Sequence, residues 1–246
     1  MTSDVHMSTQ GAAELRLERA RTGDPTAMGE CFADYYPEVY RIAATQLGRP
    51  GSGEVVAKRV MKQATLAVSR WRHVDDARRW FRHHTLLGAR DQHQARVGDN
   101  DLLLGRDDQP EPEPDYRGFL IAIRYLPSQQ REALLLHHGE GLDIRQLGIA
   151  MDCSVEAAEK HLLAAQQRLV MFNRSRYPTL LAMMVDRYRD VQPDGPLAIK
   201  LPRPSRMRRM AWRVRRLLPL VGVLAILGLI ALLVLAGALL YPRLVV

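Results

Sequence analysis

The most constraining feature of this sequence is a run of short, separately capped helices between Leu126 and Leu169. Pro127 suits the first turn of the first helix, because its ring fixes φ and its missing N–H would be unpaired there anyway. Gly139 and Gly141 then end this helix. Apolar residues recur at helical spacing through the rest of the run. The pattern predicts three helices with little chain between them.

The second and third of these helices are joined by a tight turn. Asp143 is a predicted N-cap, and Gln146 can complete a capping box with it. Asp152 tolerates a left-handed conformation, and Ser154 can cap the third helix through its hydroxyl. That helix is predicted from residue 155 to about 169, with a buried stripe of Val155, Ala158, Leu162, Ala165 and Leu169. Such a helix-turn-helix either packs as a plain hairpin or places its last helix in a DNA major groove.

Residues 217–242 contain no charged side chain. About 20 apolar residues are enough for a helix to cross a ~30 Å hydrocarbon core, so a transmembrane helix is predicted there. The positive-inside rule places everything before it in the cytoplasm. The preceding segment, 193–216, is a basic juxtamembrane linker that can also attract anionic lipids through Arg203, Arg206, Arg208, Arg209, Arg213, Arg215 and Arg216.

Those arginines account for nearly all of the formal net charge of +8. Basic composition alone therefore does not indicate nucleic-acid binding here. Cys31 and Cys153 lie far apart without a CxxC spacing, which favours reduced thiols. No nucleophile is placed with a base, and no phosphate loop or metal-ligand cluster occurs. We expect no enzyme activity, no metal and no cofactor.

The rest of the chain is predicted to be all-α. Residues 1–12 lack an apolar period and are expected to be disordered, and residues 13–97 read as a helical domain. Within it, Asp24 caps a helix, and a loop is expected at 49–53. Residues 98–116 form an acidic, Pro-rich linker, whose acidity is explained either by solvation or by mimicry of nucleic acid. A second helical domain at 117–173 is followed by an additional helix at 174–192.

The run LPSQQREALLLHHGEGLDIRQLGIAMDCSVEAAEKHLLAAQQRL resembles region four of the bacterial extracytoplasmic-function sigma factors, with its Leu-Pro start, Arg-Glu pair, Glu-Gly-Leu, Ile-Ala step and Ser-Val opening. Two earlier stretches, ARTGDPTAMGECFADYYPEVYRIA and DDARRWFRHHTLLGARD, are similar to region two of the same family. The resemblance covers about Glu14 to Leu169. It implies RNA polymerase core and promoter DNA as partners.

The resemblance also implies site residues. Region two would read melted −10 DNA through Arg78, Arg79, Arg82 and His83, since arginines beside aromatic rings suit a single strand. Region four would read duplex −35 DNA through Ser154, Lys160, His161, Gln166, Gln167 and Arg168. Polymerase would bind at Glu54, Val56, Lys58 and Arg59. The family has an acidic motif at this last place, whereas this chain is mostly basic there.

We therefore expect a membrane-anchored sigma factor, single-pass in the inner (cytoplasmic) membrane, with membrane lipids and an anti-sigma factor or another membrane regulator as further partners. The alternative is a sigma-like membrane interaction or signalling protein that no longer initiates transcription. The basic helix at 54–71 and the nearly neutral recognition helix favour this alternative.

Overall fold

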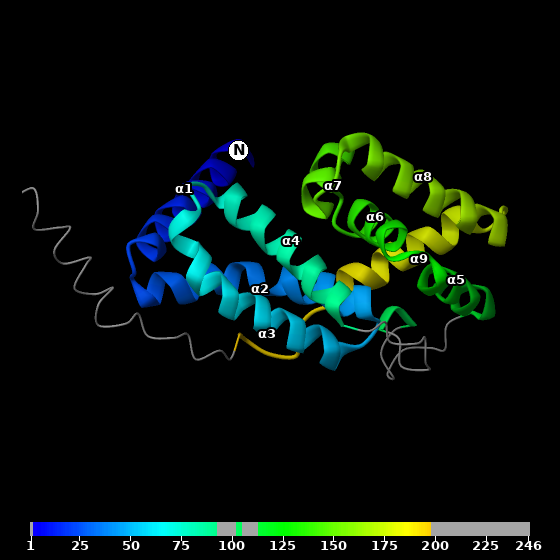
Figure 1. Ribbon diagram of the computed structural model, residues 1–246, viewed down its shortest axis with the longest axis horizontal. Coiled ribbons are helices and arrows are strands. Elements are labelled where there is room, and N and C mark those ends of the chain that lie inside the picture. The colour runs from blue at the N-terminus through cyan, green and yellow to red at the C-terminus, as the bar shows by residue number, and fades with distance from the viewer. Residues whose placement is uncertain (1, 93–101, 105–112, 198–246) are drawn as a thin grey trace, which may run out of the picture. The chain divides into compact units, whose positions relative to one another are not determined.

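The computed structural model of the chain describes residues 2–92, 102–104 and 113–197, with side chains from residue 11 onward. All regular structure within these residues is helical, which confirms the prediction of an all-α chain (Figure 1). No helix of this described part combines the length and the apolar character that crossing a bilayer requires. The span predicted at 217–242 lies outside the described residues.

The first helical group comprises α1 (Thr2–Arg21), α2 (Pro25–Leu47), α3 (Pro50–Ala67), the 3₁₀ turn η1 (Val68–Arg70) and α4 (Val74–Asp91). Helix α1 begins inside the segment that was predicted to be disordered. The cap predicted at Asp24 is confirmed, because its carboxylate accepts the backbone N–H groups of Thr26 and Ala27. Gly48 ends α2 in the left-handed conformation, at φ 72°.

The loop predicted at residues 49–53 is wrong, because helix α3 already begins at Pro50. Proline favours the first helical position, where no backbone N–H is needed. Gly53 lies in the next turn, and a Cβ added there would be 2.4 Å from the Cα of Ala44. This glycine is therefore a point at which the backbones of α2 and α3 approach closely, rather than part of a loop.

The second group comprises η2 (Leu102–Leu104), α5 (Pro114–Tyr125), α6 (Ser128–Gly139), α7 (Ile144–Met151), α8 (Val155–Phe172) and α9 (Tyr177–Asp190). Pro114, taken from the sequence as part of an extended linker, instead occupies the first turn of α5. Helix α9 is the additional helix predicted at 174–192.

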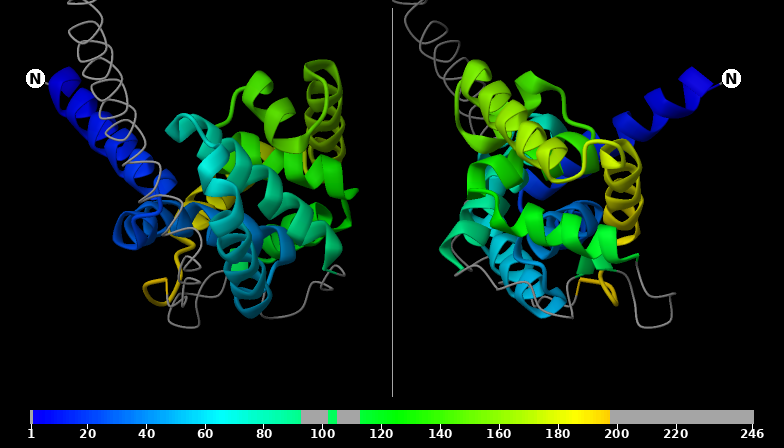
Figure 2. Two further views of the ribbon diagram at one scale, coloured as in Figure 1. Left: turned by 60° about the vertical axis from the view of Figure 1, so that its left-hand side comes forward. Right: turned by 90° about the vertical axis from the view of Figure 1, so that its right-hand side faces the viewer.

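The two groups are not independent of each other. Each has an apolar cluster of its own, but a third cluster combines Ile42 of α2 and Leu86 of α4 with residues of α6, α7 and α8. Two ion pairs flank the shared cluster. Arg41 of α2 binds Glu140 after α6, and Arg90 of α4 binds Glu132 of α6. The views in Figure 2 show α6 and α7 lying beside α2 and α4.

Candidate nucleic-acid interface

The α7–α8 turn has the local geometry that its sequence predicts. Asp143 and Gln146 form the reciprocal capping box at the start of α7. Asp152 takes the left-handed conformation at φ 57°, and the Ser154 hydroxyl accepts the N–H of Ala157 to cap α8. A Cβ at Gly148 would lie 3.1 Å from the carbonyl oxygen of Cys153, so the turn is tight against this glycine.

The buried stripe of α8 differs from its prediction at one end. Ala158, Leu162, Ala165 and Leu169 are buried, but Val155 is 43 % exposed. Ile149 of α7 is also 43 % exposed. Val155 lies directly after the turn, whereas Ile149 is followed by Ala150 and Met151, which are both buried in the shared cluster. Apolar spacing alone does not show where a helix loses contact with its neighbours.

The outward face of α8 carries Glu156, Glu159, Lys160, Leu163 and Gln167. Its charges nearly cancel, so it offers little attraction to phosphates. It does offer base-edge chemistry, because a glutamine can bind adenine, a glutamate can accept from cytosine and an apolar side chain can contact a thymine methyl. Leu163, 51 % exposed, is a candidate contact that the sequence prediction missed. The Leu162–Leu163 pair was the signal, because adjacent residues of a helix point in directions about 100° apart.

Two predicted contacts of α8 have other partners in the structure. The side-chain nitrogen of Gln166 lies 3.1 Å from Nε2 of His138 on α6. Burial, with a smaller effect of neighbouring His137, lowers the pKa of His138 to about 4, so its neutral ring can accept this hydrogen bond. The hydroxyl of Ser154 is occupied by its cap. Arg168 remains exposed, and His161 is half-buried.

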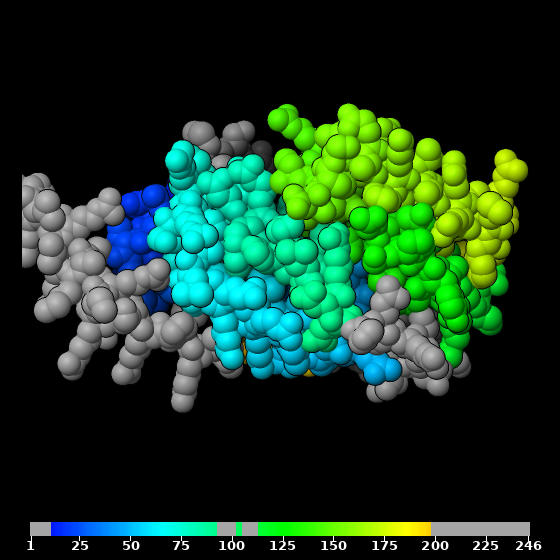
Figure 3. All heavy atoms as spheres, viewed as in Figure 1, coloured from blue at the N-terminus to red at the C-terminus, as the bar shows by residue number. Residues whose placement is uncertain are grey.

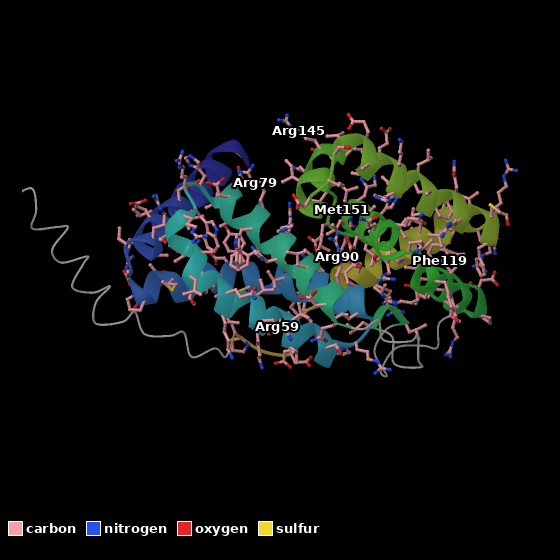
Figure 4. The ribbon with its side chains drawn as sticks, in the orientation of Figure 1. Arg59, Arg79, Arg90, Phe119, Arg145 and Met151 are labelled. Carbon is pink, nitrogen blue, oxygen red and sulfur yellow. The ribbon has the colours of Figure 1, made fainter. Side chains whose placement is uncertain are left out.

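Arg145 is a further cation that the sequence prediction left out. It occupies the first turn of α7 and is exposed, and Figure 4 shows it directed away from the helices around it. An arginine at the start of the first helix of a helix-turn-helix can contact the DNA backbone, because this helix crosses the phosphates. The signal in the sequence was its position two residues after the Asp143 cap.

The arginines of α4 differ in exposure and in their partners. The side chains of Arg78 and Arg79 are 51 % and 54 % exposed. Arg82 is only 15 % exposed, and its Nε donates to Glu38 of α2 at 2.5 Å. Arg79 also pairs with Asp76, one turn earlier on the same helix. Arg78 and Arg79 are therefore accessible to a nucleotide strand, and Arg78 also lies 3.7 Å from the Glu38 carboxylate. Arg82 mainly joins α4 to α2.

Aromatic rings lie beside these arginines. Trp80 is half-buried, and its ring centroid is 4.0 Å from that of His84 at an interplanar angle of 38°. Its ring also meets those of Trp71 and Phe81, both of which are buried in the first cluster. Burial lowers the pKa of His84, and neighbouring His83 lowers it further, which keeps the stacked ring neutral. His83 itself is half-buried and stays a candidate contact.

Helix α3 holds the residues predicted to bind polymerase. Glu54 and Arg59 are exposed, and Lys58 is partly exposed and pairs with Glu54 at 2.6 Å. Val56 is fully buried in the first cluster, so its side chain supports α3 from within. The outer face of α3 is therefore accessible at three of the four positions.

Helix α4, which carries one candidate DNA surface, touches α7, the helix that precedes α8. Helix α7 packs against α4, and Figure 3 shows their surfaces in contact. Figure 4 places Arg79 toward the N-terminal end of α4, away from α7, and Arg90 at the end that packs on the second group. Within the described residues, no group of three metal-ligating side chains comes together.

The comparison with protein families agrees with this geometry. Residues 119–169 match the family "Sigma-70, region 4", and these residues span most of α5 and all of α6 and α7, together with α8 to Leu169. No curated protein matches the chain. The match covers the helix-turn-helix and the helices that support it. Residues 119–169 are thus similar to region 4 of sigma-70 factors, which supports a sigma-factor-like DNA-binding regulator of transcription.

Proposed function

We propose that this protein is a sigma factor that directs RNA polymerase core to particular promoters from an anchored position at the inner (cytoplasmic) membrane. The observation that carries the proposal is the region 4 match over residues 119–169, where the structure has a capped helix-turn-helix. The exposed Arg78 and Arg79 support a second DNA-binding surface on α4. The similarity of residues 14–91 to region two gives that surface its role at the melted −10 element.

In this function, α8 lies in the major groove of the −35 element. Lys160, Leu163 and Gln167 meet base edges, and Arg145 and Arg168 contact phosphates. Arg78 and Arg79 hold the phosphates of the single strand, beside the half-buried ring of Trp80. Because α8 is nearly neutral, its affinity for the duplex depends on base contacts more than on counterion release.

The anchor is the uncharged segment 217–242. The arginines before it fit a cytoplasmic flank and anionic lipid head groups. Placement at a membrane also suits control by an anti-sigma factor or another membrane regulator. The anchor is tested by fusing a fluorescent protein to residue 1 and following membrane fractions after carbonate extraction. Replacing Leu227 and Leu232 by Arg should move the fusion to the soluble fraction, because charges at mid-span cost roughly 3 kcal/mol each.

The function is tested with the full chain in detergent micelles, core polymerase and a library of promoter fragments. We expect retained fragments that share a −35 sequence and support run-off transcription. Replacing both Lys160 and Gln167 by Ala should reduce transcription from these fragments, while the control Arg189→Ala, an exposed change on α9, should not. Retained core without any sequence-selective transcript would contradict the proposal.

The second candidate is a sigma-like interaction protein without initiation activity. Two observations favour it: the nearly neutral outward face of α8, and the cations Lys58 and Arg59 where the related family is acidic. Absence of any association with core polymerase at low salt would decide for this candidate.

A further inference from the structure

The chain continues beyond the region 4 match, and this continuation returns to the first helical group. Helix α9 buries Leu180, Met184 and Tyr188 in the second apolar cluster. Three residues after Tyr188, Val191 is buried in the first cluster, and Leu197 packs against that same cluster. Residues 177–197 therefore have apolar anchors in both groups.

Tyr188 also connects the two groups through polar contacts. Its hydroxyl donates to Oε1 of Glu140 at 3.0 Å, and that carboxylate binds Arg41 of α2 at 2.7 and 3.2 Å. The guanidinium of Arg41 lies 5.9 Å from the centre of the Tyr188 ring. A Cβ at Gly139 would be 2.6 Å from this ring, so the ring lies directly against the glycine. Arg41, Glu140 and Tyr188 thus connect α2, the end of α6 and α9.

After Tyr188 the chain runs along the α2 and α3 side of the first group, where Figure 1 shows it in yellow. Burial raises the pKa of Tyr40, and the next largest cause is the charge of Asp194. Burial likewise raises the pKa of Tyr36, where Glu54 and then Asp194 add to the rise. Asp194 and Glu54 therefore act on the same pair of tyrosines. The segment lies in the neighbourhood from which α3 presents its predicted polymerase contacts.

We propose that residues 177–197 form an intramolecular strap, which holds the two helical groups together and competes with RNA polymerase for the α2–α3 face. The inference rests on the proposed function, because it names a regulation of the same surface. The strap leads toward the predicted anchor, with only the segment 198–216 between them. Release of the strap uncovers the part of the first cluster that Val191 and Leu197 cover, and it removes one connection between the groups.

The strap is tested by replacing Val191 and Leu197 together by Asp in the full chain in detergent micelles. The matched control replaces Gln192 and Gly195 by Asp, which adds the same charge at exposed positions of the segment. Release is measured by the rate of trypsin cleavage after the exposed Arg189, and competition by the affinity for core polymerase. We expect faster cleavage and about tenfold tighter binding for the first variant, because the apolar contacts of the buried Val191 and the partly buried Leu197 are lost from the form in which the strap is in place. The control should behave as the wild type.

A milder variant, Tyr188→Phe, keeps the ring and removes the hydroxyl that binds Glu140, so it should shift both measurements in the same direction by a smaller factor. Circular dichroism establishes that each variant is folded. If the variant with Asp at residues 191 and 197 is cleaved at the wild-type rate, the proposal that residues 177–197 form a strap is wrong. Faster cleavage with unchanged polymerase affinity would overturn the competition and leave the proposed function intact. If neither the wild type nor the variant with Asp at residues 191 and 197 binds core polymerase, the proposed function itself is contradicted.

Discussion

Arg90 and Glu132 form a bidentate ion pair between α4 and α6, with N–O distances of 2.8 and 2.5 Å. The side chain of Glu132 is 3 % exposed and that of Arg90 is 29 % exposed. The pair lies beside the apolar cluster that Leu86 shares with α6 and α7. The C-terminal half of α4 is thus fixed to the second helical group, while its N-terminal half keeps two accessible arginines.

Replacing Arg90 by Ala should lower the free energy of unfolding by roughly 2–4 kcal/mol, because it leaves the buried Glu132 carboxylate without its partner. Chemical denaturation of the full chain in micelles measures this change. The control Arg145→Ala removes an exposed arginine and should stay within about 0.5 kcal/mol of the wild type. Equal effects of the two changes would show that the ion pair contributes no more than a surface charge.

A second prediction concerns the contact of Gly139 with Tyr188. Gly139→Ala places a Cβ 2.6 Å from the tyrosine ring, so either the ring or α6 must move. We expect a loss of about 1–3 kcal/mol in stability, the usual cost of overpacking. Gly11→Ala is the matched change at a helical glycine with nothing within 4 Å, and it should stabilise α1 by up to about 1 kcal/mol. Thermal unfolding of both variants compares them.

Local chemistry accounts for most of what the sequence predicted correctly. The box of Asp143 and Gln146, the left-handed Asp152 and the Ser154 cap depend only on neighbours within a few residues. These contacts determine where α7 and α8 begin and where the turn lies, while packing in the shared cluster stabilises the two helices. Their success explains why the resemblance to region four was visible in the sequence and is supported by the family match.

Contacts between distant residues account for what the sequence could not show. Arg82 was predicted to contact DNA, but Glu38, 44 residues earlier, binds its guanidinium. Gln166 likewise contacts His138, 28 residues earlier. Neither pairing has a signature in the spacing of residues along the chain. The same holds for the shared apolar cluster, because periodicity shows which face of a helix is apolar and not which helix covers it.

Stability should depend on pH through His138. Its pKa is lowered to about 4 by burial and by His137, whereas an unfolded histidine titrates near 6.5. The folded state therefore binds fewer protons in this range, so stability is fully present above about pH 6.5 and falls as pH decreases toward 4. Denaturation midpoints between pH 8 and pH 4 measure the slope. His138→Gln should flatten it, and His161→Gln, which leaves His138 in place, should not.

The final prediction separates the two kinds of arginine on α4. Arg79→Ala removes a side chain that is 54 % exposed, so it should weaken binding of a single-stranded oligonucleotide and leave stability nearly unchanged. If Arg79 contacts one phosphate, the slope of log affinity against log salt should fall by about 0.7. Arg82→Ala should lower the free energy of unfolding and leave oligonucleotide affinity nearly unchanged, because its partner is the carboxylate of Glu38 and its side chain is 15 % exposed. Fluorescence anisotropy across salt concentrations and chemical denaturation give the two readouts for each variant. A loss of affinity for Arg82→Ala as large as that for Arg79→Ala, at unchanged stability, would mean that Arg82 leaves Glu38 to bind the strand.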